Sequence, residues 1–185
     1  NISDLAAWCN IEFENVSANP SAYSGVLYLN DEKIENLIIP STVEIINQYT
    51  FSKNNGIKTV TLSEGVRSIG QSAFSDCTNL ESVTFNRDLL TIEDKAFWNS
   101  GIKEVSIPNS VESFEKGTFG NCSNLLMLSI GNNITSVDAS YFEGCNNLSS
   151  LTIADGPNPI ELSGDWKNFT NLENLTINRN FTIKK

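Results

Sequence analysis

Apolar side chains recur along the chain at a fixed interval of 22 or 23 residues. The clearest series is a column of phenylalanines, whose members follow one another after 23, 23, 22 and 23 residues. Each repeat can be counted from the apolar residue that opens it, such as Ile57 or Ile102. Four more apolar columns keep the same register, at three, five, nine and twelve residues after this repeat start. A period of this length indicates a repeat architecture. The phenylalanine column consists of Phe51, Phe74, Phe97, Phe119 and Phe142.

Within one repeat, the pattern predicts two extended segments and one turn of helix. In residues 58–62, 81–85 and 103–107, apolar and polar side chains alternate, which is typical of a strand. A turn and a second short extended segment follow. Residues 71–77 and 94–98 then predict a single helical turn with an inward Ala-Phe pair. Because one coil cannot bury its own apolar edge, the coils must stack, and their strands form a parallel sheet.

These registered positions resemble the leucine-rich repeats of the BspA-like family. Residues 57–79 and 102–124 match its pattern, close to L-x-x-[VI]-x-[IL]-P-x-x-V-x-x-I-x-x-x-A-F-x-x-C-x-x, at almost every position. The resemblance implies a leucine-rich repeat solenoid, which is a right-handed, β-rich α/β fold with a concave parallel β-sheet, short convex strands and single helical turns. It covers residues 34–147 most closely and residues 148–185 more weakly.

Three segments are expected along the chain. Residues 1–33 resemble the capping module that often precedes such repeats, and they include a hairpin. Residues 34–147 hold five regular repeats of 22 or 23 residues. Residues 148–185 hold a distorted repeat, in which Gly-Pro-Asn-Pro at 156–159 interrupts the strand pattern, and an incomplete C-terminal repeat that is either a cap or a cut.

The composition excludes several classes of function. Without His, the chain cannot build a Ser-His-Asp or Cys-His nucleophile system or a His-containing metal site. Its 22 acidic and 12 basic residues give a net charge of −10, whereas nucleic-acid binders need a basic surface. The apolar runs are too short for membrane insertion. The spacing of the polar residues predicts no catalytic pair, phosphate loop or metal loop, so we expect no enzyme activity and no cofactor.

Three of the four cysteines share one column of the repeat. Cys77 and Cys122 should be two coils apart, which is too far for a disulfide. Cys122 and Cys145 should lie on adjacent coils, but with parallel rather than convergent Cβ vectors. We therefore expect buried free thiols that pack as small apolar groups, while Cys9 lies outside the repeats and is unassigned.

Function in a repeat protein is expected on the exposed columns, because the buried columns pack the core. The outward strand positions of the predicted sheet are rich in hydroxyl groups and almost uncharged. Such residues suit any exposed strand, and they would equally form a broad docking surface. The candidate binding residues on this concave face are Asn36, Ile38, Thr59, Thr61, Ser82, Thr84, Lys103, Glu104, Ser106, Leu126, Met127, Ser129, Ser150 and Thr152.

One place on this face differs from the rest. Leu126 and Met127 should be exposed side by side, next to Lys103 and Glu104 of the neighbouring coil. An apolar patch rimmed by charge suits a contact centre, although single exposed apolar residues are common on any protein. Charge also alternates from coil to coil just after each repeat start, through Glu35, Lys58, Glu81 and Lys103, which should help to set the register of the coils.

The resemblance implies a non-enzymatic, secreted or surface-attached protein of adhesin type from a host-associated bacterium, which binds host or microbial proteins through its concave face. A second hypothesis is glycan binding in a surface polysaccharide system. It requires an exposed aromatic platform, for which Trp98 is the best candidate because it should point outward on the convex side. A third hypothesis is a structural spacer of a larger surface protein, without a ligand of its own. The oligomeric state stays open.

Overall fold

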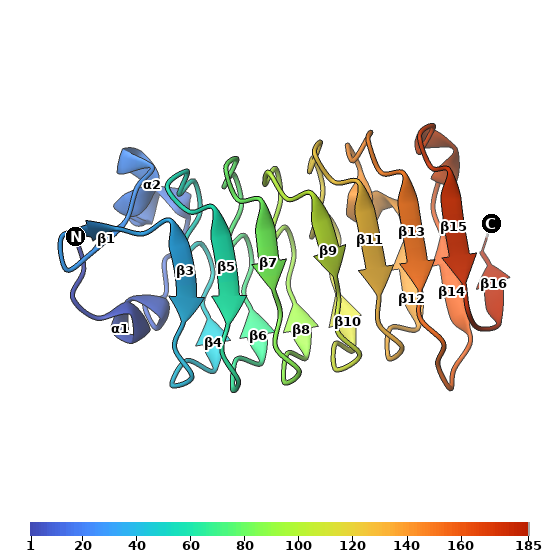
Figure 1. The fold of residues 1–185 in the computed structure, drawn as a ribbon, viewed down its shortest axis with the longest axis horizontal. Coiled ribbons are helices and arrows are strands. Elements are labelled where there is room, and N and C mark those ends of the chain that lie inside the picture. Colours follow the sequence, from blue (N-terminus) through green and yellow to red (C-terminus); the bar gives the residue numbers. More distant parts are fainter. Residues whose placement is uncertain (185) are drawn as a thin grey trace.

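The computed structural model describes residues 1–184 as a row of stacked coils (Figure 1). One strand from each coil joins a seven-stranded parallel sheet, in the order β15-β13-β11-β9-β7-β5-β3. The predicted solenoid fold is therefore confirmed. The strands of this sheet are β3 (Asn36–Ile39), β5 (Thr59–Leu62), β7 (Ser82–Thr84), β9 (Glu104–Ser106), β11 (Met127–Ile130), β13 (Ser150–Ile153) and β15 (Asn174–Ile177).

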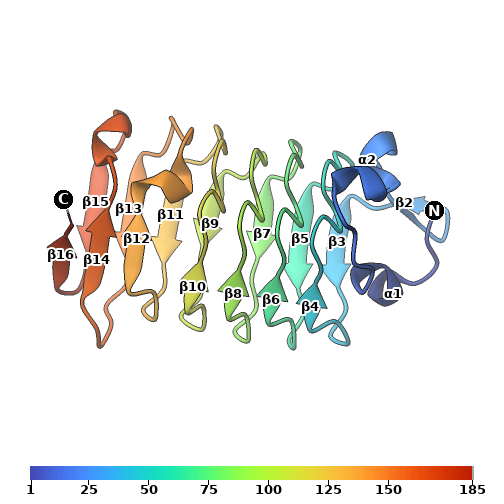
Figure 2. The same cartoon turned by 180° about the vertical axis from the view of Figure 1, so that it is seen from behind.

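The second strand of each coil lies behind this sheet (Figure 2). These rear strands form a four-stranded sheet, β10-β8-β6-β4, and a three-stranded sheet, β12-β14-β16. The seven-stranded sheet and these rear strands enclose the apolar columns between them. The rear strands are β4 (Ile45–Ile46), β6 (Ser68–Ile69), β8 (Thr91–Ile92), β10 (Ser113–Phe114), β12 (Ser136–Asp138), β14 (Ile160–Ser163) and β16 (Phe181–Ile183).

The phenylalanine column forms a stack of rings through the core. All five rings are fully buried. Phe74 lies 5.2 Å from Phe51 and 5.3 Å from Phe97 between ring centroids, and Phe97 lies 5.5 Å from Phe119. The ring of Phe97 is tilted by only 2° against that of Phe74 and by 4° against that of Phe119. Because the repeat keeps its length, identical side chains come to lie above one another in adjacent coils.

The turn that carries each phenylalanine differs from the prediction in the regular coils. Residues 71–77 and 94–98 are not helical, because Ser72 and Asp76 have positive φ angles of 53° and 58°, as does Lys95 at 55°. The backbone N–H groups of these turns bond to the next coil instead. For example, the N–H of Phe74 donates to the carbonyl of Ala96 over 2.8 Å. Within the coils of the described chain, single turns of 3₁₀-helix occur only at η2 (Ala139–Phe142) and η3 (Trp166–Asn168).

The N-terminal segment packs onto the first coil and shares its core. The indole N–H of Trp8 donates to the carbonyl of Thr50 over 3.1 Å, and the buried amide of Asn19 donates to the same carbonyl over 2.9 Å. These contacts fix the cap to the turn beside the first ring of the stack. Its elements are α1 (Leu5–Cys9), η1 (Val16–Ala18), α2 (Ser21–Ser24), β1 (Tyr28–Leu29) and β2 (Glu32–Lys33).

The hairpin of this segment has a two-residue turn. Asn30 and Asp31 both have positive φ angles, of 50° and 68°. Such angles at both central residues define the type I′ turn, whose twist matches that of the paired strands. Asp31 adopts a conformation that glycine takes more easily. The backbone N–H of Asp31 donates a hydrogen bond to Oδ1 of the Asn1 side chain over 3.1 Å.

A single arginine side chain links the last coils in addition to their strand pairing. Arg179, after β15, reaches back across two coils and donates to the carbonyls of Asn132 over 2.6 Å and Ile134 over 2.5 Å. The guanidinium of Arg179 also donates longer hydrogen bonds to the carbonyls of Gly131 and Asn158. A Cβ on Gly156 would lie 2.9 Å from Nη1, so the glycine of the distorted repeat leaves room for the guanidinium. Burial lowers the pKa of Arg179, while the negative charge of Asp155 acts in the opposite direction and raises it.

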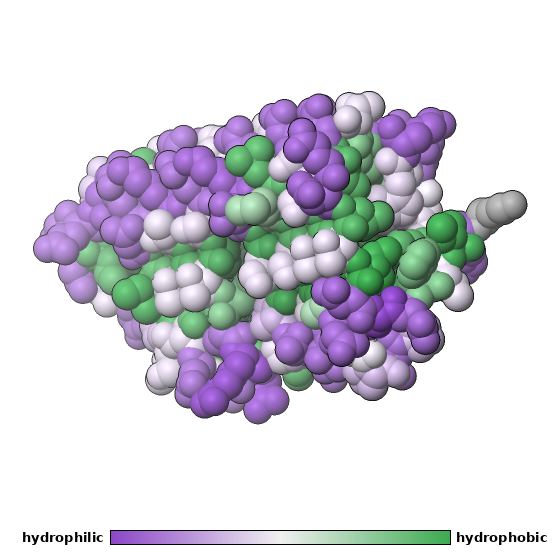
Figure 3. Space-filling model, turned by 45° about the vertical axis from the view of Figure 1, so that its right-hand side comes forward, coloured by the Kyte–Doolittle hydropathy of each residue, from purple (hydrophilic) through white to green (hydrophobic). Residues whose placement is uncertain are grey.

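Beyond this clamp, the C-terminal end presents apolar side chains to solvent. Leu175, Phe181 and Ile183 are 53%, 50% and 71% exposed. The phenylalanine stack also ends here, since Phe142 is followed by Trp166 at 6.5 Å with a tilt of 47°. Green apolar surface at this end is visible in Figure 3.

Candidate functional site

The candidate residues on the seven-stranded sheet all belong to its outward face, as the alternation of strand side chains requires. We call the outward surface of this sheet the seven-stranded face. Most of these side chains are exposed. The half-buried ones are Thr59, Ser129, Ser150 and Thr152. In Figure 3 this face shows pale hydroxyl side chains with green apolar surface between them, and purple hydrophilic side chains along both rims.

A shallow hollow of about 490 Å³ lies over strands β7, β9, β11 and β13. It brings several of the candidate residues together, and its floor includes the strand residues Val83, Val105 and Leu128. A second hollow, of about 420 Å³, lies over the earlier strands and is lined by charged and polar side chains. Ile38, Thr61, Thr84 and Leu126 line neither hollow. The candidates around the first hollow are Ser82, Glu104, Ser106, Met127, Ser129, Ser150 and Thr152.

Leu126 and Met127 are two adjacent exposed apolar residues of this face, which also exposes Ile38 on its edge strand β3. They are 45% and 44% exposed. Met127 lies opposite Glu104 in the parallel pairing of β11 with β9, and the N–H of Leu126 donates to the carbonyl of Lys103 over 2.8 Å. We call these two residues the Leu-Met patch. The backbone ladder holds the patch in place, so its position does not depend on a flexible loop.

The alternating charges form separate pairs rather than a continuous ladder. Lys58 and Lys103 each donate over 2.7 Å, to Glu35 and Glu81 respectively. Between Lys58 and Glu81 no ion pair is present in residues 1–184. The hydrogen bond from Lys103 lowers the pKa of Glu81, and that from Lys58 lowers the pKa of Glu35. Both carboxylates are therefore already engaged, and the charge that they offer to a ligand is partly neutralised.

Trp98 is half-buried in the turn that follows rear strand β8, outside the strands of the seven-stranded face. Its ring packs against the backbone of the next coil, where Gly117 and Gly120 lack side chains, and the Lys95 ammonium lies 5.9 Å from the ring centroid. Among residues 1–184, no second aromatic ring stacks on it. A sugar-binding platform needs a flat, accessible ring beside another aromatic, and Trp98 does not have this arrangement.

The contact between Trp98 and Gly120 predicts a specific effect on stability. A Cβ at Gly120 would overlap the indole, and a rigid ring cannot move aside cheaply. Gly120→Ala is expected to lower the free energy of unfolding by about 1–3 kcal/mol through overpacking. In a Trp98→Ala background the same change should cost much less. Urea denaturation of both single variants and the double variant measures this coupling, and strictly additive costs would contradict the contact.

The cysteine column is buried, as predicted, and all four cysteines of the chain are free. The thiol of Cys77 donates to the carbonyl of Phe51 over 3.1 Å, and that of Cys122 donates likewise to Phe97 over 3.1 Å. Burial raises the pKa of Cys77 to about 12 and that of Cys122 to about 11. Cys9, in the cap, is also buried, with a pKa raised to about 12.

These raised pKa values predict a loss of stability in alkaline solution. A cysteine thiol in the unfolded chain ionises near pH 8.5, so the unfolded state binds fewer protons than the folded state above that pH. The stability that the buried thiols contribute is fully present below about pH 8.5. It is lost as the pH rises through their pKa values in the folded state, which are about 11 and 12. The Cys77→Ser, Cys122→Ser double variant imitates Ser100 in the same column, and its unfolding free energy should fall less over this range. An equal fall would contradict the prediction.

Two further kinds of site concern the part of the chain that the structure describes, a metal cluster and a membrane-spanning helix. Across the described residues, no three Cys, Asp or Glu side chains gather in an arrangement suited to a metal ion. None of the helices in residues 1–184 has the length and apolar character needed to cross a membrane.

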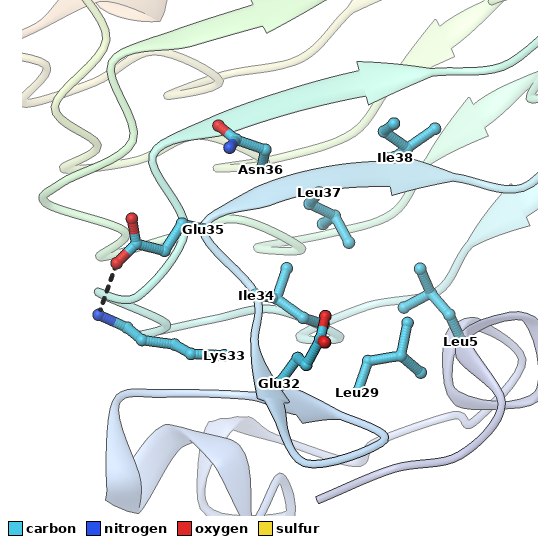
Figure 4. A pocket seen from close by; sticks show the side chains of 9 residues that line it. All are labelled: Leu5, Leu29, Glu32, Lys33, Ile34, Glu35, Asn36, Leu37 and Ile38. Atoms are coloured by element: carbon cyan, nitrogen blue, oxygen red, sulfur yellow. Dashed lines mark hydrogen bonds and ion pairs between the residues drawn. The ribbon is translucent and has the colours of Figure 1, made fainter.

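One hollow was not anticipated from the repeat pattern. It has a volume of about 520 Å³ and lies between the N-terminal cap and β3 (Figure 4). Leu5 and Leu29 come from the cap, while Ile34 and Ile38 come from the first coil. The repeat pattern identified Asn36 and Ile38 as candidates, because they lie on the sheet face. It could not identify the cap residues, because they lie outside the repeats.

Comparison with solved structures supports the fold. The pneumococcal vaccine antigen PcpA is 24% identical, with a TM-score of 0.61 over 85% of this chain and 43% of that protein. A leucine-rich repeat protein from Bacteroides ovatus is 22% identical, with a TM-score of 0.66 over 84% of this chain and 44% of that one. The leucine-rich repeat protein TpLRR of T. pallidum is 21% identical, with a TM-score of 0.69 over 81% and 73%.

These similarities show the fold alone, and the chain spans less than half the length of the first two proteins. No curated protein matches the chain. The family described as the BspA type leucine-rich repeat region matches it in six copies, over residues 25–149 and 90–185. The chain thus belongs to the BspA-type leucine-rich repeat family.

Proposed function

We propose that the chain is a non-enzymatic, adhesin-like interaction module that binds a protein partner on its seven-stranded face, outside the cell or at its surface. The observation that carries this proposal is the Leu-Met patch, an adjacent pair of exposed apolar residues on a face that is rich in hydroxyl groups. Membership of the BspA-type family supports an extracellular location, as does the naming of the structurally similar PcpA as a vaccine antigen. A host or microbial protein is the partner class.

The mechanism would be docking onto a preformed surface. Every strand between β3 and β15 is paired on both sides, so the face needs little ordering when a partner arrives. Met127 and Leu126 would supply the apolar contact, and the surrounding hydroxyl groups would donate and accept hydrogen bonds. Lys103 and Glu104 would lie at the rim, where charges guide association more than they add affinity.

A substitution in the patch tests the docking face. Met127→Asp is expected to weaken binding of the partner at least tenfold, because it places a charge at the desolvated centre of the contact. The matched control is Ile45→Asp on rear strand β4, where the isoleucine is 50% exposed, compared with 44% for Met127. The partner is first found with a panel of purified host matrix proteins and a glycan array, and affinities are then measured by surface plasmon resonance.

The two variants separate the proposal from its alternatives. Equal binding by Met127→Asp and the parent chain would remove the Leu-Met patch from the interface. Binding confined to the glycan array would favour the polysaccharide hypothesis, and the absence of any ligand in either panel would favour a spacer module. Circular dichroism of both variants verifies that the solenoid is folded.

A further inference from the structure

We propose that the free edge of β3 binds an extended polypeptide segment with a basic side chain, which adds to the seven-stranded sheet as an eighth strand beside the N-terminal cap. This site lies at the end of the sheet and does not use the Leu-Met patch. It uses the backbone edge of β3, whereas the docking proposed above centres on the Leu-Met patch, so the two sites can be tested separately. Three features of the structure carry it: an unpaired strand edge, an apolar hollow along that edge, and uncompensated acidic charge.

The first feature is the unpaired backbone of β3. This strand ends the seven-stranded sheet, and the hairpin of β1 and β2 forms a separate two-stranded sheet instead of pairing with it. The carbonyls of Glu35 and Ile39 accept from the N–H groups of the two residues that flank β5, Lys58 over 2.7 Å and Ser63 over 3.2 Å. In a parallel strand, alternate residues bond to opposite sides.

The N–H and C=O groups of Asn36 and Ile38 therefore point away from β5. Within residues 1–184, β3 pairs with β5 alone, so these four groups have no partner strand on the other side. Such an edge is a template for another strand, because backbone groups supply the affinity and alternate side chains supply the specificity.

The second feature is the hollow that runs along this edge. Leu29, Ile34 and Leu5 lie on one side of β3 in Figure 4, with open space between them and the strand. The four residues of β3 span about 13 Å at the usual rise per residue. The hollow of about 520 Å³ therefore suits a short extended segment whose alternate side chains contact this apolar wall.

The third feature is the charge around the hollow. Residues 1–32 contain five acids and no base. Glu35 is satisfied by Lys33 at 3.1 Å and Lys58 at 2.7 Å. Glu32 also lines the hollow and is exposed, and it has no ion-pair partner in residues 1–184. A lysine or arginine in the added strand would complement it, whereas an acidic side chain would be repelled.

The experiment uses a defined probe. An acetylated hexapeptide of alternating valine and threonine, with one threonine replaced by lysine, is titrated into the ¹⁵N-labelled chain at up to millimolar concentration. The expected result is a change in the amide shifts of Asn36, Ile38 and Leu29. The same peptide with glutamate in place of lysine should bind about two- to fivefold more weakly. Shift changes confined to other strands, or none at all, would overturn the proposal.

N-methylation of the probe tests strand addition without altering the protein. Methyl groups on one set of alternate residues would face β3 and remove its hydrogen bonds, which should weaken binding at least about tenfold. Methyl groups on the other set would face solvent and should leave binding nearly unchanged. Equal affinity of the two methylated peptides would contradict pairing with β3.

Protein variants complete the test. Ile38→Pro removes one free N–H without removing a bond to β5, and it should reduce peptide binding by a similar factor. Glu32→Gln should abolish the preference for lysine over glutamate. Met127→Asp should leave peptide binding unchanged, so that failure of this site and failure of the docking face can be told apart. A preference for lysine that survives Glu32→Gln would contradict the assigned role of Glu32.

Discussion

Phe97→Ala is expected to lower the free energy of unfolding by about 3–5 kcal/mol, the largest effect of any single substitution considered. The ring is fully buried and lies between two parallel rings, those of Phe74 at 5.3 Å and Phe119 at 5.5 Å. Phe85 contacts it edge-on at 5.9 Å. Its removal would leave a cavity between coils, because the backbone ladders on both sides hold the neighbouring rings in place.

Urea denaturation followed by circular dichroism measures this cost. Phe181→Ala is the matched control, because that ring lies at the solenoid end and is 50% exposed. We expect it to cost less than about 1 kcal/mol, in line with a partly exposed side chain. A cost below about 1 kcal/mol for Phe97→Ala as well would mean that the register of the coils is incorrect.

Arg179→Ala is expected to destabilise the last coils by about 2–3 kcal/mol, because bonds from a charged donor to several carbonyls are lost together. The guanidinium is the only side chain that joins the connections after β11, β13 and β15 in the described chain. Without it, the carbonyls of Asn132 and Ile134 would lose a donor. The effect should be local, since the earlier coils make no contact with Arg179.

Hydrogen exchange measured residue by residue separates this local effect from global unfolding. The amides of β15 and β16 should exchange roughly 30- to 150-fold faster in the variant, which corresponds to the expected loss of free energy. The amides of β5 and β7 should be unaffected. Arg179→Lys keeps the charge but not the forked geometry, so it should recover only part of the protection. Uniform acceleration in all strands would contradict a local clamp.

The repeating parts of the fold could be predicted because each column obeys one constraint many times. Phe74 and Phe97 occupy the same environment in successive coils, so their spacing alone reports that they stack. The same reasoning placed Cys77 and Cys122 in the core, and it located Met127 on the outward face. Strand alternation was enough for these assignments, since a buried column in one coil lies above the same column in the next.

The features that depend on one coil alone could not be predicted in this way. Arg179 bonds to carbonyls 45 to 48 residues earlier, and no periodic signal marks that contact. The packing of Trp98 over Gly120 depends on glycines that occur in one coil only, which is why the sequence suggested an exposed ring. The hollow beside β3 combines residues from the cap with residues from the first coil. In the turns, pairing with the next coil outweighed the local preference for a helical turn.

A covalent block on each face would test the docking surface most directly. The native thiols are buried, so a maleimide carrying polyethylene glycol should react selectively with a cysteine placed on the surface. Ser106→Cys lies on the seven-stranded face, and Ser113→Cys lies on rear strand β10, where the parent serine is also exposed. After the same labelling, we expect the first conjugate to lose the partner found in the binding screen and the second to retain it. Retention by the first conjugate, or loss from the second alone, would contradict docking on the seven-stranded face.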